Sequence, residues 1–150
     1  MPKPIFVLNG ANLNLLGVRE PSIYGAETLE DVKRRTQARA QTLGLSVDFR
    51  QSNLEGELVG WIQEAREQAS GIVLNAGAYT HTSIAILDAL NAAEKPVIEL
   101  HLSNVFRRES FRHHSYVAPA AQGLICGFGP KGYELAIEAM ADLLTGKAAR

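Results

Sequence analysis

The sequence contains one cysteine, Cys126, and no excess of charge of either sign. A single thiol cannot form an internal disulfide framework and fits a reducing compartment. Fifteen basic and 16 acidic side chains give a net charge of -1, so no global charge favours nucleic acid or an anionic membrane. No stretch approaches the ~18 apolar residues of a membrane span, and the apolar run before Asn9 is too short for a secretory signal. The composition therefore predicts a cytoplasmic chain without nucleic-acid or membrane partners.

Motifs that mark several common enzyme classes are also missing. The chain has no P-loop, no H-E-x-x-H zinc signature and no G-x-S-x-G nucleophile elbow. Its four histidines lack the spacing of a metal site. Gly127–Gly132 fits G-x-G-x-x-G, but no later strand supplies the acidic residue that binds a ribose. We therefore interpret that motif as a tight turn followed by a helix start.

Five short segments have the apolar or alternating pattern of β-strands, and amphipathic patterns between most of them predict helices. We expect strands at Ile5–Leu8, Ser46–Gln51, Gly71–Leu74, Val97–Leu100 and Gly123–Cys126. We expect helices at Thr28–Leu43, Leu54–Ala69, Ser83–Ala93 and from about Pro130 to Leu144. Five strand–helix units predict an α/β fold: a flavodoxin-like three-layer sandwich with a five-stranded parallel sheet. The only long irregular stretch is Asn104–Ala121. Because no linker or repeat divides the 150 residues, one domain is expected.

The segment Asn9–Gly25, NGANLNLLGVREPSIYG, is the most informative part of the chain. It directly follows a buried strand, and polar loops on rigid scaffolds commonly carry function. A guanidinium from Arg19 near the phenol of Tyr24 would favour the phenolate, which is a base. An unperturbed phenol has a pKa of about 10, so Tyr24 can equally be a loop aromatic packed on the core.

Polar side chains follow four of the five predicted strands at the edge where open α/β sheets bind ligands. These residues are Asn9, Asn12, Ser52, Asn53, Asn75, Tyr79, Thr80, His81, His101, Ser103 and Asn104. Their convergence on one edge of the sheet predicts a polar binding site there.

Glu99 and His101 are two residues apart at the end of a strand, so they share a face. A carboxylate beside an imidazole fixes its tautomer and favours its protonated form, as a general acid requires. A histidine with a purely structural role, whose ring nitrogens are hydrogen-bonded at a strand end, fits the spacing equally well. For His81, which opens the next helix, a capping or solvent-facing role is the simpler interpretation.

The basic segment Arg107–His114 admits three interpretations: a solvated face, a subunit contact or an anion clamp. Its arginines lie beside the predicted site in a chain of net charge -1, which favours a small anionic ligand. Nucleic acid is a poorer choice because no extended basic stripe with interleaved aromatics is present.

Taken together, five sequence blocks closely resemble those of the type II 3-dehydroquinate dehydratases. The blocks are NGANLNLLGVREPSIYG at 9–25, QSNLEGELVGWIQEA at 51–65, NAGAYTHTSIAILDAL at 75–90, ELHLSNVFRRESFRHHS at 99–115 and GFGPKGYELAIEAM at 127–140. Two positions depart from the family pattern. Ala11 replaces a usual proline, and Ser110 stands where a second acidic residue is common.

The resemblance implies a single catalytic domain over residues 1–150 that dehydrates 3-dehydroquinate to 3-dehydroshikimate through an enolate, in the shikimate pathway or in quinate catabolism. The ketone stores the developing charge, so no cofactor or metal is implied. In the family's pattern Tyr24 is the base and Arg19 lowers its pKa, on a loop that acts as a lid. Asn12 holds a water that supports the enolate. His101 is the general acid, oriented by Glu99.

The resemblance also implies how the substrate is held and how the chain assembles. The substrate-binding residues would be Asn75, His81, Asp88, Leu102 through its backbone, Ser103 and Arg112. The family forms trimers that assemble into dodecamers, and the Asp88 contact comes from a neighbouring subunit.

From the residues alone, two other functions stay open. A flavodoxin-like phosphate- or nucleotide-binding protein would use the glycine loops and the basic segment as an anion cradle, and nucleotide or flavin would then shift its melting. An assembly or regulatory protein would use the Arg/His segment as an interface and form oligomers without turnover.

Overall fold

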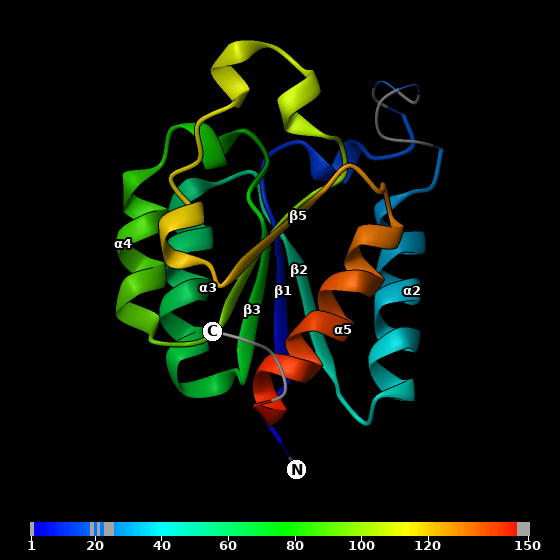
Figure 1. Ribbon diagram of the computed structural model, residues 1–150, viewed down its shortest axis with the longest axis vertical. Helices are drawn as coiled ribbons and strands as arrows, with labels where there is room; N and C mark the ends of the chain where they lie inside the picture. Colours follow the sequence, from blue (N-terminus) through cyan, green and yellow to red (C-terminus); the bar gives the residue numbers. More distant parts are fainter. Residues whose placement is uncertain (1, 19, 21, 23–25, 147–150) are drawn as a thin grey trace.

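A five-stranded sheet with parallel neighbours forms the centre of the computed structural model, which describes residues 2–18, 20, 22 and 26–146 (Figure 1). The strand order is β2-β1-β3-β4-β5. The strands are β1 Ile5–Asn9, β2 Val47–Gln51, β3 Gly71–Asn75, β4 Val97–His101 and β5 Gly123–Cys126. The predicted fold class is confirmed, and each strand ends within about one residue of its predicted bounds.

Long helices cover both faces of this sheet, α3 and α4 on one side and α2 and α5 on the other (Figure 1). They are α2 Leu29–Thr42, α3 Glu55–Gln68, α4 Ile84–Ala93 and α5 Lys131–Thr145. A capping box between Thr28 and Asp31 starts α2. None of the helices in the described residues is both long and apolar enough to span a membrane.

The three central strands β1, β3 and β4 are buried along their whole length. The protein has a hydrophobic core on each face of the sheet. Successive residues of a strand pack into different cores, because their side chains point to opposite faces. Phe6 and Leu8 join the core beneath α3 and α4, whereas Ile5 and Val7 join the core beneath α2 and α5. Burial on both faces explains the continuous apolar runs in these strands.

The connection from β4 to β5 contains no α-helix, so the prediction of five strand–helix units is wrong there. Three short 3-10 helices take its place: Val105–Arg107, Ser110–Arg112 and Ala118–Ala120. The side chains of Asn104 and Ser115 accept hydrogen bonds from the backbone N–H groups of Phe106 and Val117. Such bonds take the place of the backbone hydrogen bonds that an α-helix would need. The predicted irregular stretch is confirmed, and it rises above the carboxyl edge of the sheet (Figure 1).

The loops that leave β1 and β3 touch each other at the carboxyl edge. β1 leads to α2 on one face and β3 leads toward α4 on the other, so the two strands form the topological switch point of the sheet. The backbone N–H of Gly10 donates to the carbonyl of Asn75 at 2.8 Å. A Cβ on Gly10 would lie 2.1 Å from the carbonyl oxygen of Ala76. Gly77 has a φ of +63°, and a Cβ there would lie 2.8 Å from the carbonyl oxygen of Ala11.

This close contact predicts opposite effects for two glycine-to-alanine changes. Gly10→Ala must push the β3 loop away and is expected to lower the free energy of unfolding by more than about 2 kcal/mol. Gly60 lies on α3, and no atom lies within 4 Å of a Cβ added there. Gly60→Ala should therefore raise the free energy of unfolding by about 0.5–1 kcal/mol, because alanine has the higher helix propensity. Urea unfolding measures both. Equal effects would show that the loops can separate without cost.

Candidate functional site

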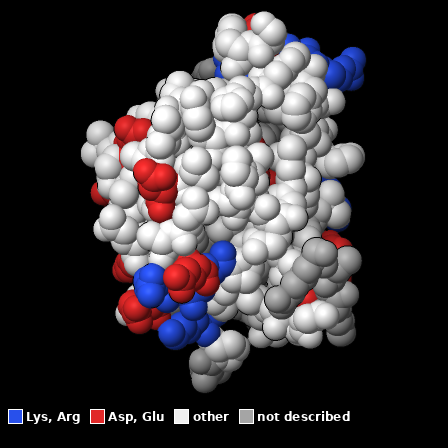
Figure 2. Space-filling view, turned by 60° about the vertical axis from the view of Figure 1, so that its left-hand side comes forward, with Lys and Arg blue, Asp and Glu red and all other residues white. Residues whose placement is uncertain are grey.

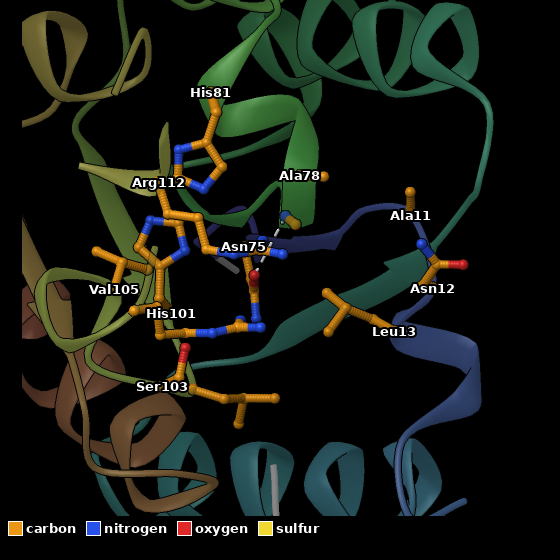
Figure 3. Close-up of a pocket in the computed structure, with 13 residues that line it drawn as sticks. Ala11, Asn12, Leu13, Asn75, Ala78, His81, His101, Ser103, Val105 and Arg112 are labelled. Atoms are coloured by element: carbon orange, nitrogen blue, oxygen red, sulfur yellow. Dashed lines mark hydrogen bonds between the residues drawn. The ribbon is translucent and has the colours of Figure 1, made fainter. Parts of the chain in front are cut away.

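A small cavity of about 60 Å³ lies at the switch point, enclosed by the segments that follow β1, β3 and β4 (Figure 3). Its lining residues are Ala11, Asn12, Leu13, Asn75, Gly77, Ala78, His81, His101, Leu102, Ser103, Val105, Arg108 and Arg112. It adjoins a wider hollow of about 600 Å³ that shares Leu102, Ser103 and Arg108 and extends to Gly127 and Gly129. The predicted convergence of strand ends is therefore present in the fold.

Most of the predicted site residues meet in this cavity. Those lining it are Asn12, Asn75, His81, His101, Leu102, Ser103 and Arg112. Glu99 lies behind His101 in β4. Asp88 does not line the cavity and is exposed on α4. Arg19 and Tyr24 lie outside the described residues, so their proposed roles remain predictions.

The Glu99–His101 pair forms as its spacing predicts. His101 Nε2 lies 2.5 Å from Glu99 Oε2, and only 1% of Glu99 and 5% of His101 are exposed. A buried carboxylate is costly unless its oxygens are satisfied. A close hydrogen bond to the imidazole satisfies one oxygen and fixes the orientation of the ring.

Ser115 completes the surroundings of Glu99, although it is not among the residues predicted for the site. Its hydroxyl oxygen accepts hydrogen bonds from the backbone N–H groups of Val117 and Ala118 at 3.1 and 3.0 Å. Its single proton is therefore donated to the carboxylate of Glu99, whose oxygens lie 2.9 and 3.0 Å away. Ser115 lies 16 residues from Glu99 in an irregular segment, so no periodic signal links the two.

His81 presents a neutral imidazole to the cavity. Its Nδ1 lies 2.8 Å from the carbonyl oxygen of His114, and a carbonyl only accepts, so Nδ1 carries the proton. Burial lowers the pKa of His81, and the hydrogen bond to His114 does not offset that effect. Its ring stacks on His101 with centroids 6.3 Å apart. Nε2 of His81 is thus an acceptor that suits a ligand hydroxyl.

Asn75 is held by a buried polar cluster that includes Tyr133 of α5. The Asn75 Nδ2 atom donates to the Tyr133 hydroxyl at 2.9 Å, and that hydroxyl donates to Asn9 Oδ1 at 2.6 Å. Burial raises the pKa of Tyr133, so the phenol keeps its proton. Tyr133 is not among the residues predicted for the site; the available signal was a tyrosine on a buried helix face, whose hydroxyl requires a partner.

Asn12 begins a 3-10 turn on the opposite wall of the cavity. Its φ of +70° is a left-handed conformation, which asparagine tolerates better than most residues. Its backbone N–H donates to Asn53 Oδ1 at 2.9 Å, and the Asn53 carbonyl accepts from Tyr79 at 2.7 Å. The ends of β1 and β2 are thereby joined around Asn12.

Two arginines of the basic segment line the cavity. The side chains of Arg108 and Arg112 are 14% and 20% exposed. Glu109 lies 3.7 and 3.2 Å from their Nε atoms, and the pKa of Glu109 is lowered by a backbone hydrogen bond and by Arg112. Of the three interpretations of this segment, a clamp for a small anion agrees with its place at the cavity.

The structure also describes the metal-ligating side chains and the glycine motif that the sequence analysis considered. In the described part of the chain, no three His, Cys, Asp or Glu side chains are grouped so that they could hold a metal ion. Gly127 and Gly129 adopt φ values of +97° and +58°, and α5 begins at Lys131. The glycine motif is therefore a tight turn and a helix start, as predicted.

Comparisons with known proteins agree on one family. The model of the class II dehydroquinases matches residues 3–141. The 3-dehydroquinate dehydratase of Mesorhizobium japonicum is 61% identical over 143 residues, which cover 95% of this chain and 99% of that protein. The corresponding protein of Caulobacter vibrioides is 60% identical over 144 residues, 96% of this chain and 99% of its own length. The crystal structure of type II dehydroquinase from Propionibacterium acnes superposes with a TM-score of 0.90 at 47% identity, covering 94% of this chain and 97% of that one.

The surroundings of His81 predict a pH effect. We expect its pKa to lie below 6.5 by NMR titration, with the proton of the neutral form on Nδ1. As the pH drops, His81 of the unfolded chain therefore takes up its proton before His81 of the folded chain does. The free energy of unfolding falls as the pH drops from about 6.5 through the pKa of His81 in the folded chain. In His81→Gln this part of the acid destabilisation should disappear. A pKa above 6.5, or a neutral form protonated on Nε2, would contradict the assignment.

Proposed function

The chain belongs to the class II dehydroquinase family, and on that premise we propose that its cavity converts 3-dehydroquinate to 3-dehydroshikimate. The reaction is that of a hydro-lyase, a type II 3-dehydroquinate dehydratase of the shikimate pathway. One observation supports the proposal most strongly. His101, held from behind by the buried Glu99, shares one cavity at the switch point with the His81 imidazole, the Asn75 carboxamide and the guanidiniums of Arg108 and Arg112.

The substrate determines which groups the site must supply. 3-Dehydroquinate is a β-hydroxy ketone that bears a carboxylate. A base removes the proton α to the ketone and an enolate forms. The β-hydroxyl then leaves as water after an acid protonates it. The site therefore needs a base, an acid, a support for the enolate oxygen and a cation for the carboxylate.

We assign the acid to His101. Its imidazolium would protonate the departing hydroxyl, and the carboxylate of Glu99 would stabilise the charged ring from behind. Ser115 keeps Glu99 in place through the hydroxyl proton that it donates. In this arrangement the proton donor faces the cavity, whereas its counter-charge is buried in the fold.

We assign the base to Tyr24 and its activation to Arg19, on the strength of the family resemblance. Holding a phenolate near neutral pH needs a pKa shift of roughly 3 units, or about 4 kcal/mol. One exposed arginine does not supply that much. Arg108 and Arg112 share the carboxylate of Glu109 and together leave a net positive, partly desolvated charge at the cavity, which supports the assignment.

The remaining lining groups suit the hydroxyls, the carboxylate and the enolate. Nε2 of His81 accepts a hydrogen bond and Nδ2 of Asn75 donates one, so the two can hold substrate hydroxyls. Arg112 is suited to the carboxylate, because its guanidinium can bind two oxygens at once. Three further roles come from the resemblance: Leu102 through its backbone and Ser103 contact the substrate, and Asn12 holds the water that supports the enolate.

The test is an ultraviolet assay for the conjugated enone product. The unaltered chain should form product, and His101→Ala and Tyr24→Phe should each lower kcat by about 10²–10⁴-fold, the usual contribution of a general acid or base. Two matched control variants remove a phenol hydroxyl and an imidazole from positions outside the cavity. Tyr116→Phe and His114→Ala are expected to keep kcat within about threefold, because neither side chain lines the cavity.

Each outcome of this assay has a separate meaning. Absence of product from the unaltered chain would reject the proposed function. Full activity in Tyr24→Phe would reject the assigned base, and full activity in His101→Ala the assigned acid. Binding of flavin or nucleotide, seen as a melting shift, would instead support the nucleotide-binding alternative.

We further propose a cytoplasmic homo-oligomer, a dodecamer built from trimers, in which Asp88 serves a neighbouring site. Asp88 is exposed on α4 and does not line the cavity of its own chain. Figure 2 turns the left-hand side of Figure 1, where α4 lies, toward the viewer, and much of this face is free of charged side chains. Exposed small or apolar residues of α4 and of the 3-10 helix Ala118–Ala120 include Ile84, Ala85, Ala92, Ala118 and Pro119. An exposed uncharged surface of this kind suits contact with a second copy.

Mixing two inactive variants tests whether Asp88 acts in a neighbouring subunit. Asp88→Ala and His101→Ala should each be nearly inactive alone. After the two are co-assembled, up to about a quarter of the sites combine an intact His101 with a neighbour's intact Asp88, so activity should return. Light scattering should show trimers or their multiples. No recovery in a mixed trimer would place Asp88 in the site of its own chain, and an Asp88→Ala variant that is active alone would place it outside any site.

A further inference from the structure

A chain of buried hydrogen bonds runs from β2 to the wall of the cavity. The Asn9 Nδ2 atom donates to the backbone carbonyl of Arg50 at 2.9 Å. Asn9 Oδ1 accepts the proton of the Tyr133 hydroxyl at 2.6 Å, and that hydroxyl oxygen accepts from Asn75 Nδ2 at 2.9 Å. Asn9 and Tyr133 are 0% exposed and Asn75 is 3% exposed, so water does not compete for these groups.

The direction of every bond in this chain follows from its first member. A backbone carbonyl can only accept, so the Asn9 amide must turn its nitrogen toward Arg50 and its oxygen toward Tyr133. Tyr133 must then donate to Asn9, because its phenol keeps its proton. Its oxygen is left to accept, and Asn75 must therefore turn its nitrogen toward Tyr133. One backbone carbonyl thus sets the orientation of a side chain at the cavity.

The other half of the Asn75 amide agrees with this orientation. Its Oδ1 accepts from the backbone N–H of Gly77 at 3.3 Å, the bond drawn as a dashed line in Figure 3. That contact is longer than the usual 2.9–3.0 Å, so alone it holds the amide weakly. Nδ2 carries two protons, of which Tyr133 takes one. The second proton is available to a ligand oxygen in the cavity.

We propose that Tyr133 is a positioning residue, whose hydroxyl fixes Asn75 so that it offers an N–H donor to the substrate. The inference rests on the proposed function and extends it to a residue that does not line the cavity. Without the hydroxyl, the Asn75 amide can rotate and present its oxygen instead. A carboxylate, or a substrate hydroxyl that donates its proton to Nε2 of His81, then has an acceptor facing its oxygen. Binding is weakened before and during the reaction alike, so the loss should appear in KM.

The experiment is a double-mutant cycle with Tyr133→Phe and Asn75→Ala. Tyr133→Phe should raise KM about tenfold and change kcat less than about threefold, as expected for one lost hydrogen bond to the bound substrate. In the Asn75→Ala background it should raise KM less than about twofold, because the group that it positions is gone. Asn9→Ala, which removes the acceptor of the Tyr133 proton, should also raise KM and serves if Tyr133→Phe does not fold.

Thr36→Val is the matched control for a purely structural role. The Thr36 hydroxyl is also fully buried and donates to the Val32 carbonyl at 2.7 Å, within α2 and away from the cavity. Both variants should lower Tm, but only Tyr133→Phe should raise KM. A KM within twofold of the unaltered chain, or the same rise in both backgrounds of the cycle, would overturn the proposal.

A second measurement separates this inference from the proposed function. The side-chain amide of Asn75, assigned in ¹⁵N NMR spectra by its loss in Asn75→Ala, should exchange its protons at least about tenfold faster in Tyr133→Phe. Unchanged exchange would reject the positioning role whether or not the chain turns over dehydroquinate. Absence of product from the unaltered chain, with faster exchange in the variant, would reject only the reaction.

Discussion

The contact between the loops after β1 and β3 is the constraint on which the rest of the site depends. These strands lie side by side, yet their chains leave toward opposite faces of the sheet, so a crevice opens where they part. Gly10 and the carbonyls of Asn75 and Ala76 are packed too closely for any side chain at position 10. The same contact places Asn12 on one wall and Asn75 on the other. Backbone packing therefore fixes the distance across the cavity.

The buried carboxylate of Glu99 imposes a second constraint, on the irregular connection above the sheet. Its charge needs partners within the fold, and His101 and Ser115 supply them. Ser115 belongs to that connection, so its hydrogen bond to Glu99 holds the segment at the end of β4. Arg108 and Arg112 precede this attachment and line the cavity as a consequence. A connection without an α-helix can thus still be held in one place.

The sequence predicts the fold well because β1, β3 and β4 are buried on both faces and end in polar residues. The Glu99–His101 pair could be predicted from the two-residue period of a strand. Ser115 and Tyr133 could not, because they reach Glu99 and Asn75 across 16 and 58 residues of chain. Nothing local in the sequence encodes such contacts. The roles of Arg19 and Tyr24 rest on their spacing in the sequence and on the family resemblance, since both residues lie outside the described part of the chain.

The two stacked histidines show how one cavity can separate proton transfer from neutral hydrogen bonding. Their ring centroids are 6.3 Å apart, so two positive charges there would repel each other. His81 is bonded to a backbone carbonyl and burial lowers its pKa, whereas His101 is bonded to a carboxylate. The proposed assignment of His101 as the acid therefore needs a positive charge only on the ring that has a counter-ion. The proposed acid and the proposed hydroxyl acceptor are therefore distinguished by their hydrogen-bond partners, although both are imidazoles.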